Sequence, residues 1–397
     1  MKYAVIVCDG MSDRTIAQLG NKTPMALAYK PNIDALAQKG EAGLVKTVSA
    51  DFRPGNDVAH LSVLGYDPKM YYTGLSPFEA AGSGIDLKDD DVALRCNFVT
   101  LSDEESYEDK IMLDYSADDI SSAEAEILIE YIEEKLGNEI FRFYNGSGYR
   151  HCLVWTQGEP RPGVLTPPRN ITEKKITDYI PKGDFVAPLY DLMRKSYELL
   201  KEHPINSRRS SEGKKTANSV WLWGEGMKPH LDSFSEKFDV SASVISDVDL
   251  LNGIGRYADM TVCRIADDYE MKAQTAVNEL KRGQDLVYIH TEAPDQYSYH
   301  ADIENKIKSI ELIDKYLVGY IVNALRKMGE EFSVMILSAI STPTQLRTHT
   351  SDPVPYLIYR SNDEKTGGVE IFDEYSAFAA GLYVSPGYNL MNRFLQK

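Results

Sequence analysis

The sequence predicts an α/β protein with a doubly wound sheet as its core and a smaller inserted α+β domain. The chain opens on a continuous apolar run, YAVIVC at 3–8, which is typical of a strand buried in a parallel sheet. Later apolar runs alternate with helical patterns, as βαβ units require. The pattern changes in the middle of the chain. We therefore expect 1–88 and 215–397 to form the core and 89–214 to form the inserted domain.

Each expected element of the core has a local signal. The segment NIDALAQKG is typical of a helix with Asn32 as its N-cap and Gly40 as its stop. Apolar residues on one face predict a second helix over 57–64. Further strands are expected in NSVWLWGE, ASVIS, DLVYIHTEA and FSVMILSA. A long amphipathic helix should end at Gly329, because glycine readily stops a helix.

The middle of the chain has a different pattern. The runs DVALRCNFVTL (91–101) and HCLVWTQ (151–157) are typical of strands. Between them, ISSAEAEILIEYIEEKLG predicts a helix with a capping box from Ser121 to Glu124 and a stop at Gly137. The following GEPRPGVLTPPRNI is rich in turn formers. Strands and helices without regular alternation indicate an α+β domain.

Composition and charge exclude several classes of protein. The net charge is -17 and the basic residues are dispersed, whereas nucleic-acid binding needs a basic face. No apolar run approaches the length of a membrane span. The four cysteines lack metal-binding spacing, which favours reduced thiols. The chain starts directly with a strand, so we expect no signal peptide and a cytoplasmic location.

The stretch RPGNDVAHLS, residues 53–62, is a glycine-containing loop that runs into a helix. Such a junction can hold an anion, because free backbone N–H groups and the helix dipole both face the loop. Asn56 stands at its mouth. An asparagine amide can donate a hydrogen bond to phosphate, but it has no proton that ionises near neutral pH. We expect Asn56 to hold an anion or to cap the helix, and not to transfer a phosphoryl group.

Other polar residues follow the expected strands. Asp9 follows the first strand, Glu292 and Asp295 follow DLVYIHT, and His349 precedes a later strand. Ligands in open α/β sheets lie beyond the carboxyl ends of the strands, so these residues should meet at one edge. Asp and His are ligands suited to Zn or Mn. Each residue taken singly is better explained as a helix cap, a turn residue or, for His349, a partner of the backbone.

Many segments resemble the archaeal-type cofactor-independent phosphoglycerate mutases of the alkaline phosphatase superfamily, including a branch proposed to act as homoserine kinases. The resemblance covers nearly the whole chain and implies an alkaline-phosphatase-like core. It also implies a serine nucleophile and two divalent metals, Mn or Zn. The segments that carry it include VIVCDGMSD, LGNKTP, FRPGNDVAHLSVLGYDP, YYTGLSPFEAAGSGI, DVALRCNF, GYRHCLVW, HPIN, GIGR, EAPD, STP and SDPVP.

The resemblance implies one metal site at Asp295, His349 and the position of Tyr299, where the family has a histidine. Two of these three ligands are kept. His300 lies one residue beyond the lost ligand, and a shift of ~100° on a helix would point it away. Glu292 is a second possible replacement. His300 and Glu292 therefore both remain possible replacement ligands for a metal site.

The other implied metal site departs further from the family pattern. It would use Asp9 and the positions of Asn56, Ala339 and Ile340, and only Asp9 is a competent ligand there. Asn56 stands at the position of the family's serine. The family's Gly-rich loop after GIGR is missing, because CRIADDYEMKAQ runs straight into the next helix. We expect Ile340 and Tyr299 to occupy space that metals hold in the family.

These departures predict a mutase homologue with a degenerate metal and nucleophile site, a pseudoenzyme that binds no metal tightly. It would act by binding a phosphorylated small molecule, a second copy of itself or an active relative. The alternative is an active metal-dependent 2,3-bisphosphoglycerate-independent phosphoglycerate mutase. A related homoserine kinase-like phosphotransferase that uses altered residues belongs to the same alternative.

Overall fold

The computed structural model describes residues 1–396, which divide into two compact units. The first unit comprises Met1–Tyr72 and His230–Lys397, and the second comprises Thr73–Pro229. The second unit is thus longer at both ends than the predicted 89–214. The extension at the C-terminal end arises because NSVWLWGE, predicted as a core strand, forms β7 (Ser219–Met227), which pairs with β3 (Val92–Leu101) of the second unit.

The first unit contains an eight-stranded sheet of order β13-β2-β12-β11-β1-β10-β8-β9. Its central strands are parallel, whereas β12 is antiparallel to both of its neighbours. In chain order the strands are β1 (Lys2–Cys8), β2 (Glu41–Val45), β8 (Ala242–Ser246), β9 (Thr261–Arg264), β10 (Leu286–Thr291), β11 (Phe332–Leu337), β12 (Val354–Arg360) and β13 (Tyr383–Val384).

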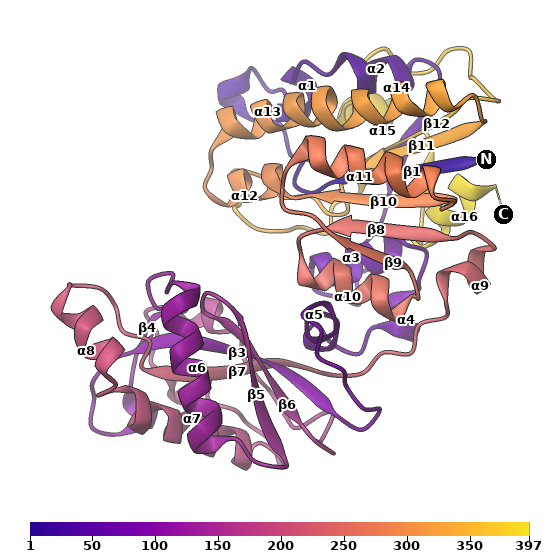
Figure 1. Ribbon diagram of the computed structural model, residues 1–397. Helices are drawn as coiled ribbons and strands as arrows, with labels where there is room; N and C mark the ends of the chain where they lie inside the picture. Colours follow the sequence, from indigo (N-terminus) through magenta and orange to yellow (C-terminus); the bar gives the residue numbers. More distant parts are fainter. Residues whose placement is uncertain (397) are drawn as a thin grey trace. The chain divides into compact units, whose positions relative to one another are not determined.

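Helices cover both faces of this sheet, and Figure 1 shows α11 and α14 on one face and α10 and α3 on the other. The sheet and helices bury a core of aliphatic residues from β1, β10, β11 and the covering helices. The helices are α1 (Pro24–Leu27), α2 (Pro31–Ala37), α3 (Asn56–Val63), α4 (Pro68–Tyr71), α9 (Phe234–Phe238), α10 (Asp249–Tyr257), α11 (Tyr269–Lys281), α12 (Ala293–Tyr299), α13 (Ile303–Leu312), α14 (Gly319–Met328), α15 (Glu374–Ala379) and α16 (Asn389–Leu395). A 3-10 turn, η1 (Ala17–Leu19), follows β1.

The predicted long helix is present, with an internal change of winding. A π-helical segment, η5 (Ile313–Val318), joins α13 to α14, and Gly329 ends α14 in the left-handed conformation at φ 73°. The helix predicted to start at Asn32 starts instead at Pro31, and Lys30 at its N-cap provides no side-chain cap. The carboxylate of Asp314 in η5 accepts hydrogen bonds from the N–H groups of Asn32 and Ile33 instead.

The second unit is an α+β domain with its own sheet and core. Its strands run in the order β4-β3-β6-β5, with β7 also paired to β3. One half of the predicted capping box is present, because the Ser121 hydroxyl accepts the N–H of Glu124 at the start of α6. The Glu124 carboxylate accepts hydrogen bonds from Arg208 and Arg209. The remaining elements are α5 (Ser76–Gly82), η2 (Tyr107–Asp109), β4 (Met112–Asp114), α6 (Ser122–Leu136), β5 (Phe141–Ser147), β6 (Arg150–Trp155), η3 (Pro168–Ile171), η4 (Ile176–Asp178), α7 (Ala187–Leu200) and α8 (Pro204–Ser211).

Candidate metal and anion site

Asp9 is the centre of a fully buried polar cluster at the carboxyl end of β1. Its Oδ2 lies 2.8 Å from His60 Nε2 and 3.1 Å from His290 Nε2. Its Oδ1 accepts the backbone N–H of Ala339 at 3.0 Å. Burial opposes ionisation of Asp9, but the two histidines outweigh it and lower the pKa of this carboxyl. Asp9 is therefore held as a carboxylate by groups from three distant parts of the chain.

The two histidines reach Asp9 from different elements. β10 is parallel to β1 and pairs His290 with Val7, which places this histidine beside the end of β1. His60 lies on α3, four residues after Asn56, so both residues share one face of the helix. Burial lowers the pKa of His60, whereas Asp9 outweighs burial at His290 and raises its pKa. Neither histidine was predicted as a site residue.

Each histidine is oriented by a second contact. His60 Nδ1 lies 2.7 Å from the Tyr288 hydroxyl, and His290 Nδ1 lies 3.1 Å from Ser246 Oγ. Both partners are buried. Such contacts fix the ring orientation and leave each Nε2 directed at Asp9.

A second cluster contains the three residues predicted for the other metal site. His349 Nε2 lies 3.2 Å from Asp295 Oδ1 and 3.0 Å from the Tyr299 hydroxyl. Asp295 also accepts a hydrogen bond from the hydroxyl of Thr342, a residue that sequence reasoning missed. Burial lowers the pKa of His349, but Asp295 outweighs it, so this pKa is raised. The structure thus brings Asp295, Tyr299 and His349 together.

The two clusters are linked through Gly10, which follows Asp9. Gly10 adopts φ +73°, a conformation that favours glycine. A Cβ at this position would overlap the backbone of Asp295 at the start of α12. The tight approach of this loop to α12 therefore depends on glycine.

The residues expected at the site around Asp9 do not fit the family's metal there. Ala339 and Ile340 are buried, at 0% and 1% exposure, and their side chains offer no ligand atom. His60 and His290 are the imidazoles next to Asp9 instead. Neither predicted rescuer makes a ligand contact in the described structure: His300 is exposed at the C-cap of α12, and Glu292 accepts a hydrogen bond from Gln296 at 2.7 Å.

Asn56 begins α3, one residue before the predicted start of this helix. Gly55 supplies no side-chain cap, and Asn56 Oδ1 is buried without a hydrogen-bond partner among the described residues. The next residue, Asp57, accepts a hydrogen bond from the Tyr72 hydroxyl at 2.5 Å. Asn56 therefore sits at the mouth of the loop-to-helix junction and does not act as a helix cap through Oδ1.

A buried ammonium group lies near this edge of the sheet. Only residues 265–268 connect β9 to α11. Lys272 in α11 is fully buried and lies 2.8 Å from Asp267 and 3.3 Å from Asp247. The Thr291 hydroxyl at the end of β10 also donates to Asp267 at 3.2 Å. This short connection brings the ammonium group of Lys272 and its carboxylate partners close to the strand ends.

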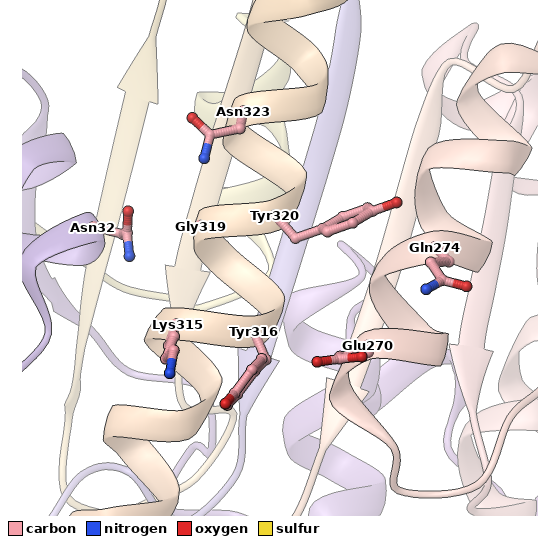
Figure 2. Close-up of a pocket in the computed structure, with 8 residues that line it drawn as sticks. All are labelled: Asn32, Glu270, Gln274, Lys315, Tyr316, Gly319, Tyr320 and Asn323. Atoms are coloured by element: carbon pink, nitrogen blue, oxygen red, sulfur yellow. The ribbon is translucent and has the colours of Figure 1, made fainter.

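A separate surface hollow of about 400 Å³ lies over η5, α14 and α11. Figure 2 shows Glu270 and Gln274 on one helix and Tyr316 and Tyr320 on the other. Its lining is a mixture of polar and aromatic groups and, within residues 1–396, includes no member of the two clusters. This hollow is therefore not an entrance to them.

Comparison with known proteins identifies close relatives along the whole chain. A profile described as 2,3-bisphosphoglycerate-independent phosphoglycerate mutase matches residues 37–206. A protein named 2,3-bisphosphoglycerate-independent phosphoglycerate mutase from Methanosarcina barkeri is 43% identical over 387 residues, which cover 95% of each chain. A protein of the same name from Methanothrix thermoacetophila is 42% identical over 398 residues, which cover 98% of each chain.

Solved structures share the fold. A Pyrococcus horikoshii protein superposes with a TM-score of 0.81 at 29% identity, covering 100% of this chain and 97% of the other. The cofactor-independent phosphoglycerate mutase from Thermoplasma acidophilum superposes with a TM-score of 0.66 at 27% identity, covering 100% and 99%. The expected α/β fold is confirmed, and the cofactor-independent phosphoglycerate mutase shares it.

The comparisons support the alternative function better than the expected one. The relatives' names favour the alternative, an active mutase, and nothing among them supports the expected pseudoenzyme or its degenerate metal site. No helix within residues 1–396 has the length and apolar character needed to cross a membrane. The full-length identity above 40% establishes the relationship: the chain belongs to the 2,3-bisphosphoglycerate-independent phosphoglycerate mutase family.

Proposed function

We propose that this chain binds a phosphorylated hydroxy acid of the phosphoglycerate class and carries no phosphoryl group on residue 56. The observation that supports this proposal is Asn56 at the N-terminus of α3, where Gly55 provides no side-chain cap. Among the described residues, the only backbone N–H that the Asp57 carboxylate accepts is that of Val58. Backbone N–H groups in the first turn of a helix lack intrahelical partners and favour an anion. The Asn56 amide adds a donor for phosphate oxygens, but it cannot act as an ionised nucleophile.

The absence of a nucleophile at residue 56 favours a protein that binds its ligand without converting it. In a well-studied serine hydrolase, removal of the nucleophile alone lowers the rate by roughly 10⁶. Here the apolar side chains of Ala339 and Ile340 add a second loss, because they cannot hold a metal that would stabilise a transferring phosphoryl group.

A second candidate is an active mutase, or a related phosphotransferase, that uses altered residues. The supporting observation is the 42–43% identity over 95% or more of this chain to proteins named as mutases. Under this candidate, a group other than residue 56 would accept the phosphoryl group.

One pair of measurements separates the candidates. Calorimetric titration with 2- and 3-phosphoglycerate measures binding, and phosphorus NMR of the same mixtures measures interconversion, with the Methanosarcina barkeri relative as positive control. We expect binding without interconversion above a protein-free sample. Interconversion would establish the second candidate, and absence of both binding and interconversion would overturn both.

Two variants at residue 56 sharpen the test. Asn56→Asp places a negative charge at the helix N-terminus and should weaken phosphoglycerate binding by roughly tenfold or more. Asn323→Asp, on the exposed surface of α14, is the matched control and should leave binding unchanged. Asn56→Ser should not produce turnover, because Ala339 and Ile340 remain. Robust turnover by Asn56→Ser would contradict our account of the site.

A further inference from the structure

We propose that Asp9, His60 and His290 form a binding site for one transition-metal ion, for which Zn²⁺ is the best-suited probe. One ligand atom from each residue lies within 4.8 Å of the other two. Two imidazoles and a carboxylate are the protein ligands of some catalytic zinc sites. They also form the facial triad that binds non-haem iron. This set shares only Asp9 with the ligands implied by the family resemblance. It does not require the proposed ligand binding, although Asn56 takes part in both proposals.

The three donor atoms converge on one point. Both Nε2 atoms approach the same oxygen of Asp9, Oδ2, at 2.8 and 3.1 Å. The other oxygen, Oδ1, is held by the backbone N–H of Ala339. The carboxylate therefore presents a single oxygen to the two imidazoles, as a monodentate ligand does.

The hydrogen bonds around the three residues resemble those around the ligands of known metal sites. Each histidine has a partner at Nδ1, Tyr288 for His60 and Ser246 for His290. Partners of this kind fix the ring and direct the ligating nitrogen to the metal. The three ligands also come from rigid elements, the end of β1, helix α3 and strand β10. The donor set is therefore oriented before any ion binds.

An unpaired oxygen nearby supplies a candidate for a fourth ligand. Asn56 Oδ1 is buried and has no hydrogen-bond partner within the described residues. Asn56 precedes His60 by one helical turn on α3, so the two side chains lie on one face. Buried polar atoms without a partner are costly and call for an explanation. Coordination of an ion by the amide oxygen provides one.

A competing arrangement contains no metal. In it, both histidines donate their Nε2–H groups to Asp9, and the cluster only positions the carboxylate. A metal requires each Nε2 to present its lone pair, so the proton of a neutral ring must then lie on Nδ1, toward Tyr288 or Ser246. The two arrangements therefore differ in which ring nitrogen carries the proton.

The test uses the full chain, stripped with a chelator and titrated calorimetrically with Zn²⁺. We expect one Zn²⁺ per chain. His60→Gln and His290→Gln should each weaken binding by at least the roughly 10–100-fold that loss of a supporting partner costs. Asp295→Asn is the matched control in the neighbouring cluster and should retain the affinity of the wild type.

Three results would overturn the proposal. The wild type could bind no Zn²⁺, the two histidine variants could bind as tightly as the wild type, or Asp295→Asn could abolish binding. Circular dichroism of each variant establishes that it is folded. If the histidine variants do not fold, X-ray absorption of the Zn²⁺-loaded wild type replaces them. Two imidazole ligands are expected, whereas the Asp295 cluster would provide one.

Discussion

His151 in β6 is a buried histidine whose surroundings favour the neutral ring. It is 5% exposed, and its ring packs against Phe98. Its Nδ1 accepts the N–H of Gly146 at 3.1 Å, and its Nε2 has no partner among the described residues. Burial lowers its pKa from 6.5 to about 4. Protonation of this residue is therefore much easier in the unfolded chain than in the folded protein.

The resulting prediction concerns pH and stability. Between pH 6.5 and about 4 the unfolded chain binds a proton that the folded protein excludes, so stability falls as the pH is lowered through this range. The contribution of His151 to the free energy of unfolding should decrease by roughly 3 kcal/mol at most. Urea denaturation of the wild type and His151→Gln at several pH values measures it.

The variant His151→Gln should have the flatter stability profile over this range. His300→Gln, at an exposed position, is the control and should follow the wild type. Parallel profiles for the wild type and His151→Gln would show that the ring does not control this pH dependence.

Single residues of the candidate site were predicted with mixed success. The sequence placed Asp9, Asp295 and His349 at strand ends, because the edge of a parallel sheet collects such residues. His60 and His290 were not predicted as members of the site, because a histidine in an apolar run is usually a buried core residue. The spacing of four residues between Asn56 and His60 was the available signal, since it places both on one helix face.

At the scale of elements, helix α2 depends on a distant cap. Asp314 in η5 is buried and accepts the N–H of Ile33 at 2.7 Å and of Asn32 at 3.3 Å. Its Oδ2 also accepts the side-chain amide of Asn32 at 2.8 Å. No local sequence signal reveals a cap supplied from 282 residues away, which explains why Asn32 was predicted as the N-cap.

Removal of this cap should destabilise the first unit. Asp314→Ala leaves buried backbone N–H groups without partners and should lower the free energy of unfolding by roughly 2–3 kcal/mol. Asp314→Asn keeps one acceptor and should lose less. Lys308→Ala, at an exposed position of α13, is the control and should change stability by less than about 0.5 kcal/mol. Equal melting curves for Asp314→Ala and the control would refute the capping role.

The strands themselves were recognisable from apolar runs, but their partners were not. The segment NSVWLWGE was correctly predicted as a strand and assigned to the wrong sheet. Its antiparallel pairing with β3 is a long-range contact that periodicity does not encode. The second unit extends beyond residue 214 for the same reason.

At the scale of the whole molecule, the second unit is one continuous segment, Thr73–Pro229, with its own sheet and core. A continuous unit with its own core can fold alone. We expect a fragment of residues 73–229 to unfold cooperatively, as measured by circular dichroism and tryptophan fluorescence. A fragment of residues 89–214 is the matched comparison. It lacks β7 and should not fold cooperatively, because β3 loses its partner and buried side chains such as Trp221 are removed.

Two outcomes would contradict this account of the second unit. Non-cooperative unfolding of the 73–229 fragment would mean that its core is insufficient alone. Cooperative unfolding of the 89–214 fragment would mean that β7 is dispensable.

Gly10 has a consequence for how this chain tolerates amino-acid change. Its backbone lies against that of Asp295, and its conformation excludes side chains whatever chemistry the neighbouring residues perform. Selection for a folded protein alone should therefore preserve this glycine, while Asn56 and Tyr299 stay free to vary. Substitutions can replace the reactive groups at this edge of the sheet while the glycine that lets the Asp9 loop pack against α12 is kept. The glycine at position 10 is thus a requirement of folding, and it carries no information about turnover.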